Sequence, residues 1–225
     1  MNEYQAALTY WDEVFKTHDV EKLEGAFLGC EVLENKLKEL ALLHKILDFG
    51  CGTGWASLFL AQVGCASVVG VDQSNNAINI ASDNAKLNNL SSQLQFICAD
   101  EHYFDSVYDN TFKGFFSSNT LDVIPFDFAE KILLQVKRVC SSTAKIFIMI
   151  NPYLTEEIKE RNELQQISSD SYARDGVLRC VNKTNDEWIN ILEKYFTLVS
   201  YDEFKFDEEP LGYKRRLFIL KNDQK

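Results

Sequence analysis

Proline and glycine are scarce in this chain, with three prolines and ten glycines among 225 residues. This scarcity excludes collagen-like and low-complexity sequences, which are rich in these residues. No stretch rich in proline, glycine and serine divides the chain, and no internal repeat is visible. We therefore expect one domain over residues 1–225.

Long hydrophobic runs are missing too. No stretch approaches the roughly 18 apolar residues that a membrane-spanning helix needs. The N-terminus has no basic segment followed by an apolar one, so we expect no signal peptide. The sequence thus predicts a cytoplasmic protein that does not bind a membrane.

The usual ligands of a zinc site are also lacking. The chain has three histidines, and no two of its six cysteines form a C-x-x-C pair, so we expect no metal site. Cysteines within apolar runs, as in Ile97-Cys98 and Val139-Cys140, are predicted to be small core residues in a reducing compartment.

Basic residues are outnumbered, with 23 Lys and Arg against 34 Asp and Glu, a formal net charge of −11. Charge of this sign repels the phosphate backbone of nucleic acids. Nucleic acid is therefore not expected as a partner. Hydrophobic residues make up 46% of the chain, enough for a sizeable core.

Apolar residues recur at helical spacing in two N-terminal segments, 4–17 and 21–44. After residue 44, short apolar runs alternate with helical patterns. Strands are expected at 45–49, 67–72, 94–98, 112–117 and 144–150, and helices at 56–63, 74–88 (capped by Ser74) and 128–140. This alternation indicates βαβ units and a parallel sheet.

The C-terminal part has a different pattern. A helix is expected at 184–196, with Thr184 as its cap, followed by two strand-like runs at 197–206 and 216–221. No helix separates these two runs. They therefore predict a hairpin, and with it one antiparallel edge of the sheet.

The most informative stretch joins the first expected strand to a helix and contains Gly50, Gly52 and Gly54. Glycine permits a left-handed backbone and the close approach of a ligand. Such a turn suits a dinucleotide pyrophosphate or a cofactor without phosphate. The spacing differs from the dinucleotide fingerprint G-x-G-x-x-G, because Trp55 occupies the position of the third glycine. No Gly-Lys-Ser/Thr follows, so a Walker motif is excluded as well.

Three carboxylates follow successive strands. Asp48 precedes the glycine turn, where it would repel a pyrophosphate but suit a cationic group such as an ammonium. Asp72 ends the second strand and can accept both hydroxyls of a ribose. Asp100 follows the third strand and can accept a hydrogen bond from an adenine amino group. Ligands of open α/β sheets bind at this edge of the sheet.

With these motifs the sequence resembles the class I S-adenosylmethionine-dependent methyltransferases. The resemblance covers residues 45–220 and is carried by four motifs: Asp48-x-Gly50-x-Gly52-x-Gly54, Gly70–Ser74, Cys98–Asp100 and Phe112–Leu121. It implies a Rossmann-like three-layer α/β sandwich with a seven-stranded, mostly parallel sheet. The implied strand order is 3-2-1-4-5-7-6, with strand seven antiparallel and residues 1–44 forming an N-terminal helical extension.

The resemblance also implies S-adenosyl-L-methionine as cofactor, with S-adenosyl-L-homocysteine as product. Asp48 would lie near the ammonium, Asp72 would bind the ribose, and Asp100 would bind the adenine. The other implied cofactor-binding residues are Gly50, Cys51, Gly52, Gln73, Glu101, Ser117 and Ser118. Trp11 is a further candidate, either as part of a lid over the cofactor or as an ordinary core residue.

No catalytic base can be named from the sequence. His102 stands next to Glu101 and is either a base or a surface residue. The segment 152–183, between the fifth strand and the next helix, is expected to choose the acceptor, with Tyr153 and Tyr172 as candidate substrate contacts. Asn151-Pro152-Tyr153 resembles an amine-gripping motif of some family members, but it follows the fifth strand instead of the fourth. It is interpreted as a strand terminator.

The expected activity is transfer of a methyl group to a small-molecule acceptor by in-line displacement, which depends mainly on proximity and orientation. A methyltransferase acting on a protein, or less readily on RNA, is the first alternative. A cofactor-binding protein without catalytic activity is the second. A nicotinamide-dependent dehydrogenase is disfavoured by the glycine spacing.

Overall fold

The computed structural model describes residues 3–210 and 212–223. Its helices are α1 (Glu3–Phe15), α2 (Glu31–Ala41), α3 (Trp55–Gln62), α4 (Asn75–Leu87), α5 (Phe126–Val139), α6 (Glu156–Arg161) and α7 (Asn185–Leu192), with a 3-10 helix at Glu101–Ser106. Its strands are β1 (Ile46–Phe49), β2 (Val68–Asp72), β3 (Leu94–Cys98), β4 (Phe112–Ser118), β5 (Cys140–Ile150), β6 (Gln165–Gln166), β7 (Ser171–Arg174), β8 (Val177–Val181), β9 (Thr197–Phe204) and β10 (Arg215–Lys221).

Seven strands form one sheet in the order β3-β2-β1-β4-β5-β10-β9. Strands β1 to β5 pair in parallel, whereas β10 is antiparallel to both of its neighbours, β5 and β9. Within this sheet β9 and β10 are the sixth and seventh strands. The predicted order 3-2-1-4-5-7-6, with an antiparallel seventh strand, is therefore confirmed.

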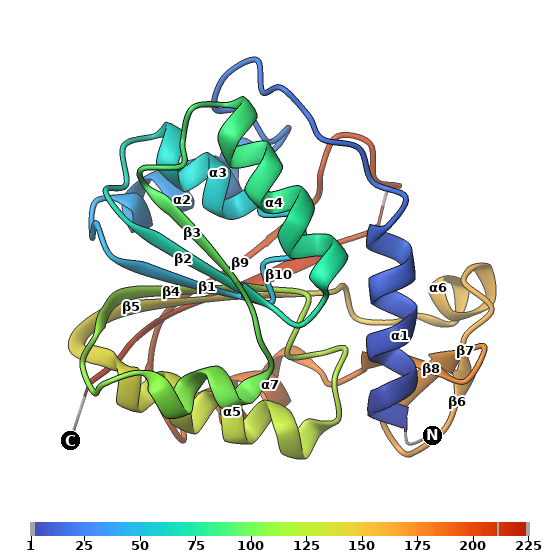
Figure 1. Cartoon of the computed structure of the whole chain (residues 1–225). Coiled ribbons are helices and arrows are strands. Elements are labelled where there is room, and N and C mark those ends of the chain that lie inside the picture. Colours follow the sequence, from blue (N-terminus) through green and yellow to red (C-terminus); the bar gives the residue numbers. More distant parts are fainter. Residues whose placement is uncertain (1–2, 211, 224–225) are drawn as a thin grey trace.

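The sheet is the middle of three layers, with α2, α3 and α4 on one face and α5 and α7 on the other (Figure 1). Side chains of its central strands alternate between two buried clusters. On β4, Phe115 packs towards α5 and α7, while Phe116 packs towards α2 and α3. Both faces are buried, which explains why the central strands appear in the sequence as continuous apolar runs.

Side-chain caps set the start of two predicted helices. The Ser74 side chain accepts a hydrogen bond from the Ala77 backbone N–H at the start of α4. Thr184 and Glu187 form a capping box at the start of α7. Each cap satisfies N–H groups that have no partner inside the helix, so both predicted caps are confirmed.

The helix predicted over 21–44 is wrong over residues 21–30. Helix α2 begins only at Glu31, and the chain before it is irregular because Gly25 and Gly29 adopt left-handed backbone angles, with φ of 128° and 70°. The segment 19–24 is tied instead to α4. Asn84 and Asn88 accept hydrogen bonds from the backbone N–H groups of Glu21 and Leu23.

One cysteine differs from its predicted environment. All six cysteines are free, and five of them are buried as expected. Cys98 is exposed, because it ends β3, the edge strand of the sheet. The apolar run Leu94–Cys98 therefore does not have the two-sided burial of the central strands.

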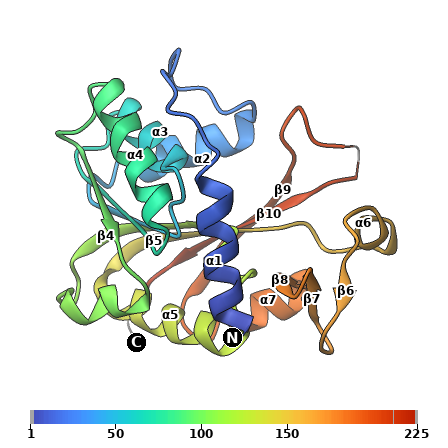
Figure 2. The same cartoon turned by 45° about the vertical axis from the view of Figure 1, so that its right-hand side comes forward.

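The segment between β5 and α7 forms a small structure of its own. Strands β6, β7 and β8 make a three-stranded antiparallel sheet, and α6 precedes it. Figure 2 shows this sheet beside α1, at the end of the large sheet. Within the described residues no helix is long and apolar enough to cross a membrane.

Replacing Phe115 by Ala tests the two-sided core. The ring is fully buried, so the variant should lose about 3–5 kcal/mol of unfolding free energy, measured by urea denaturation. Tyr108→Ala is the control, because its side chain is 87% exposed and should change the unfolding free energy little. Equal losses in the two variants would contradict the described packing.

Candidate functional site

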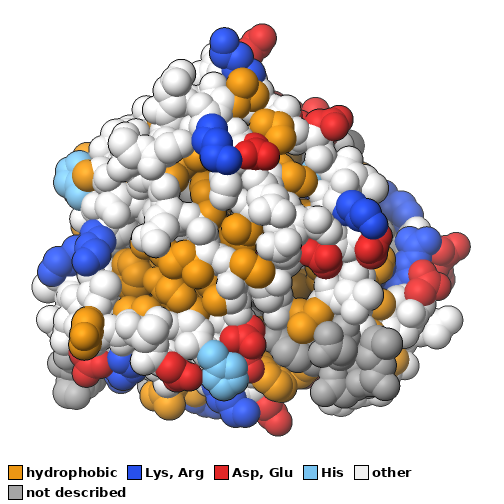
Figure 3. Space-filling view, in the orientation of Figure 1, with side chains coloured by type: hydrophobic (Ala, Val, Ile, Leu, Met, Phe, Trp, Pro, Cys, Tyr) orange, Lys and Arg blue, Asp and Glu red, His pale blue; other side chains and the backbone are white. Residues whose placement is uncertain are grey.

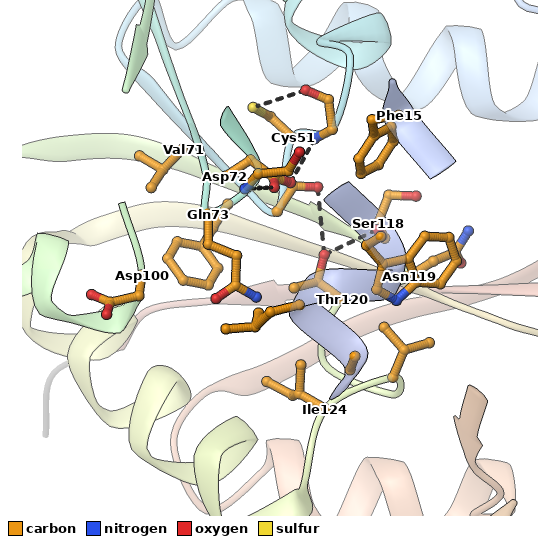
Figure 4. A pocket seen from close by; sticks show the side chains of 18 of the residues that line it. Phe15, Cys51, Val71, Asp72, Gln73, Asp100, Ser118, Asn119, Thr120 and Ile124 are labelled. Atoms are coloured by element: carbon orange, nitrogen blue, oxygen red, sulfur yellow. Dashed lines mark hydrogen bonds between the residues drawn. The ribbon is translucent and has the colours of Figure 1, made fainter. Parts of the chain in front are cut away.

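A cavity of about 350 Å³ lies at the carboxyl ends of the strands β1 to β4. It is closed on one side by α1, which contributes Ala7, Leu8, Trp11 and Phe15. Figure 4 shows Asp100 and Gln73 towards one end of this cavity and Phe15, Ser118 and Asn119 towards the other. The strand order reverses between β1 and β4, and such a reversal is where open α/β sheets bind their ligands.

The glycine turn forms the floor of this cavity, and two of its glycines, Gly50 and Gly52, line the cavity. Gly50 and Gly52 have φ of 72° and 53°, a region that side chains disfavour. A Cβ on Gly50 would lie 2.0 Å from the Thr120 hydroxyl oxygen, and one on Gly52 would lie 3.2 Å from the Phe15 ring. Parts of the β4–α5 loop and of α1 thus pack directly against the turn.

Asp72 ends β2 at the cavity wall and is held by backbone N–H groups. Its two carboxylate oxygens accept hydrogen bonds from Gly52 and Ser74, each at 2.9 Å. Burial raises its pKa in spite of these bonds. The carboxylate therefore has a fixed orientation at the cavity wall.

Five more predicted residues contribute to the same wall. Asp100 accepts a hydrogen bond from the His102 backbone N–H and caps the 3-10 helix that follows it. Gln73, Asp100 and Glu101 line the cavity, as do Cys51 and Ser118 on other loops. Burial raises the pKa of the Cys51 thiol well above its usual value, so this group is not a thiolate nucleophile.

Trp11 is one of the residues that line the cavity. This is the position expected for part of a lid over the cofactor, which is one of the two roles that the sequence leaves open. Its indole Nε1 is buried and has no hydrogen-bond partner. The same holds for the Oδ1 atom of Asn119, another lining residue. A ligand that offers both an acceptor and a donor would satisfy these two atoms.

Asp48 and Ser117 do not line the cavity, which corrects their predicted contact with it. Asp48 is 1% exposed and faces α3, where the Ser57 hydroxyl donates to it at 2.7 Å. Ser117 is buried as well and donates a hydrogen bond to the Phe49 carbonyl. Side chains alternate along a strand, so the cavity receives Ser118 and the loop residues Asn119 and Thr120 instead.

Burial dominates the electrostatics of Asp48. It raises the pKa of this carboxyl to about 7, although the Ser57 hydrogen bond opposes the shift. Burial thus favours the protonated, uncharged form of this carboxyl group.

Tyr153 and Tyr172, the candidate substrate contacts, lie outside the cavity lining. Tyr153 is 45% exposed, and Tyr172 is buried beside Leu154, Ile158 and Cys180 within the insert. Tyr172 therefore stabilises the insert. The strand-terminator interpretation of residues 151–153 agrees with the end of β5 at Ile150.

Sequence reasoning missed several wall residues. His18 lines the cavity, whereas His102 is exposed and bonded to Asp105. Phe15 lies on the apolar face of α1, so the helical spacing of apolar residues over 4–17 is the signal that could have found it. The other missed residues are Ala7, Leu8, Phe49, Thr53, Trp55, Val71, Ser74, Ala99, Asn119, Thr120, Val123, Ile124 and Ile132. Among the described residues, no group of three or more His, Cys, Asp and Glu side chains could hold a metal ion.

Comparison with known proteins agrees with this geometry. A family model described as "Methyltransferase domain" matches residues 43–195, which is more than half of the chain. The chain therefore belongs to the methyltransferase domain family.

Individual relatives differ in what their names say they modify. A ubiquinone biosynthesis O-methyltransferase from Rhizobium etli is 34% identical over 110 residues, covering 45% of this chain and 44% of that protein. The human eEF1A lysine and N-terminal methyltransferase is 25% identical over 191 residues, covering 83% of this chain and 26% of that protein. The chain spans less than half the length of these curated relatives.

The fold is also found among solved structures. A SAM-dependent methyltransferase from Methanosarcina mazei superposes with a TM-score of 0.66 at 23% identity, covering 84% of this chain and 95% of that one. At this identity the likeness concerns the fold alone.

The buried carboxyl of Asp48 predicts a specific pH dependence of stability. Because its pKa is raised in the folded state, its favourable contribution is complete below pH 4 and is lost as the pH rises through 7. The Asp48→Asn variant has no ionisable group at this position, so its unfolding free energy should not decrease in this way as the pH rises. Its unfolding free energy relative to the wild type should increase by about 3 kcal/mol between pH 4 and pH 8.

Urea denaturation at a series of pH values measures this difference. Asp83→Asn, which removes an exposed carboxylate from α4, is the control for a general loss of negative charge. A constant difference between Asp48→Asn and the wild type would contradict the raised pKa.

Proposed function

We propose that this chain transfers a methyl group from S-adenosylmethionine to a small-molecule acceptor bound in the cavity beneath α1. The single observation that carries the proposal is the wall itself. A glycine turn after β1, a fixed carboxylate after β2 and a second carboxylate after β3 all face one cavity. The residue roles below are part of the proposal.

The residues present suit this cofactor. The cavity volume of about 350 Å³ falls in the range of small-molecule sites. The unpartnered N–H of Trp11 and the unpartnered Oδ1 of Asn119 are complementary to the carboxylate and the ammonium of an amino acid. Asp72 has the remaining lone pairs to accept two ribose hydroxyls, and Asp100 is a fitting partner for the adenine amino group.

When bound, S-adenosylmethionine supplies an electrophilic methyl group on a sulfonium sulfur. The chain's own contribution is then mainly positional. Gly50 and Gly52 allow close backbone approach, while Gln73, Glu101, Cys51 and Ser118 complete the wall.

Trp11 and Phe15 cover the cavity and keep water from it. Asp48 and Ser117 support the turn and the strand end from behind.

The wall also limits the charge of the acceptor. Within the described part of the chain, the cavity lining contains the carboxylates of Asp72, Asp100 and Glu101 but no Lys or Arg side chain. An acceptor with a phosphate or carboxylate near its reacting atom would have no Lys or Arg side chain of the cavity lining to pair with. A neutral acceptor, or one with an amino group, fits this wall better.

Nucleic acid fits poorly as an acceptor. The net charge is −11, and on the face seen in Figure 3 the Lys and Arg side chains are scattered, without forming a continuous stripe.

A protein acceptor is the second candidate. The same absence of cations in the lining favours an amino group, such as that of a lysine side chain. The small-molecule proposal rests on α1, which covers the cavity with Trp11 and Phe15 and leaves less room for an inserted polypeptide.

Replacing Asp72 by Ala tests cofactor binding. Losing the ribose contacts and the two backbone bonds of this carboxylate should weaken S-adenosylmethionine binding roughly 10- to 100-fold in calorimetry. Asp83→Ala is the matched control and should bind like the wild type. Binding of NAD by the wild type in place of S-adenosylmethionine would refute the proposal.

A methyl-label screen tests the acceptor class. Metabolites, peptides and RNA are offered with labelled S-adenosylmethionine, and each metabolite is paired with an analogue that adds a carboxylate or phosphate beside the reacting atom. We expect label on neutral or amine metabolites and at least about tenfold less label on the anionic analogues. Label on peptides alone supports the second candidate. No label anywhere indicates a binding protein without catalytic activity.

A further inference from the structure

Helix α1 carries an aspartate, Asp12, whose side chain accepts hydrogen bonds from residues at the start of α4, far away in the sequence. The Ser74 hydroxyl donates to Asp12 Oδ1 at 2.6 Å, and the Asn76 backbone N–H donates to the same oxygen at 3.2 Å. The Asn76 side-chain amide donates to Asp12 Oδ2 at 3.0 Å and to the Asp12 backbone oxygen at 3.1 Å. These hydrogen bonds connect α1 to the cap and first turn of α4.

Helix α4 does not need Asp12 as its cap. The Ser74 side chain already fills that role by accepting from the Ala77 N–H. Asp12 adds an acceptor for the Asn76 N–H, another group without a partner inside the helix, and a negative charge at the positive end of the helix. The Ser74 hydrogen bond lowers the pKa of Asp12, as expected for a carboxylate that is charged in this contact.

Ser74 connects this contact to the cavity wall. Its backbone N–H donates to Asp72 Oδ1, while its hydroxyl donates to Asp12 Oδ1. One residue therefore helps to orient the carboxylate at the end of β2 and also holds α1.

The residues next to Asp12 show what this contact holds in place. Trp11 and Phe15 line the cavity, and the Phe15 ring packs against Gly52 of the turn. On the other side of α1, the Arg179 guanidinium of β8 stacks on the Tyr10 ring at 3.7 Å from its centre. Figure 1 shows α1 between α4 and the small sheet that contains β8.

We propose that Asp12 is a positioning residue, which fixes α1 on α4 through Ser74 and Asn76 and thereby keeps the Trp11 and Phe15 wall of the cavity in place. This inference rests on the proposed function only for the identity of the ligand. The hydrogen bonds between Asp12 and α4 are directional and charge-assisted. The stack of Arg179 on the Tyr10 ring is less directional, so it allows α1 to shift along its axis. Asp12 therefore sets the position of α1 along α4.

A thermodynamic consequence follows for ligand binding. If the wall is formed in only a fraction of the molecules, the apparent dissociation constant of the cofactor rises by the inverse of that fraction. By the same linkage, a bound cofactor that contacts Trp11 and Phe15 stabilises α1 on α4.

Hydrogen exchange of the cofactor-free protein tests the contact directly. In Asp12→Ala, the amides of α1 should exchange roughly tenfold faster than in the wild type, while those of β1, β4 and β5 keep their rates. Asp83→Ala is the matched control, since it removes an exposed aspartate of α4 that pairs with Lys86 on the same helix. Should Asp12→Ala fail to fold, Asp12→Asn keeps the side-chain volume and one acceptor oxygen and serves instead.

Calorimetry with S-adenosylmethionine supplies the functional readout. We expect a dissociation constant roughly tenfold higher in Asp12→Ala and unchanged in Asp83→Ala. In the wild type, the cofactor should slow exchange of α1. Wild-type exchange of α1 in Asp12→Ala, or faster exchange spread evenly over the whole chain, overturns the positioning role.

The two proposals fail in different ways. A wild-type protein that does not bind S-adenosylmethionine refutes the proposed function, while the exchange comparison without ligand still tests Asp12. Normal cofactor affinity in Asp12→Ala refutes the positioning role and leaves the proposed function intact.

Discussion

The architecture of the site depends on the left-handed backbone of the turn after β1. Gly50 and Gly52 can adopt these angles because they lack a Cβ, and the space that a Cβ would fill holds Thr120 and Phe15. The turn, the β4–α5 loop and α1 are far apart in the sequence, and they therefore contact one another at a few backbone atoms of the turn. The turn opens a cavity beyond the strand ends and also fixes how closely the β4–α5 loop and α1 approach it.

The acidic residues near this turn serve different physical purposes. Asp48 lies behind it in a dry environment that raises its pKa to about 7. Asp72 lies in the wall, with its orientation set by two backbone N–H groups. Asp12 belongs to α1 and is kept charged by its hydrogen bonds to α4. The carboxylates behind the net charge of −11 thus include one behind the turn, one in the cavity wall and one in the contact between α1 and α4, in addition to ordinary surface charge.

Much of the fold could be predicted because its determinants are local. Apolar runs of five residues ending in glycine or aspartate mark buried parallel strands, and Ser74 and Thr184 mark helix starts. The predicted helix 21–44 does not form over residues 21–30. Its apolar spacing is helical, but Gly25 and Gly29 adopt left-handed backbone angles that break the helix. In the site, Asp72, Asp100 and the glycines were found from their place at strand ends. Ser117 and Ser118 are adjacent in sequence, but only the second faces the cavity, since strand side chains alternate and register follows from packing.

The sequence by itself determined the alternation of strands and helices, the glycine turn and the carboxylates that follow β2 and β3, because period, caps and glycine spacing act over a few residues. The strand order was implied only by the resemblance to the class I methyltransferases. Only the tertiary structure decided which residues close the cavity. Trp11, Phe15 and His18 come from the N-terminal segment, while Tyr153 and Tyr172 of the insert stay outside. Closure depends on contacts such as Asp12 with Ser74, which join positions 62 residues apart. No local pattern encodes such a contact, since it depends on how helices pack against a completed sheet.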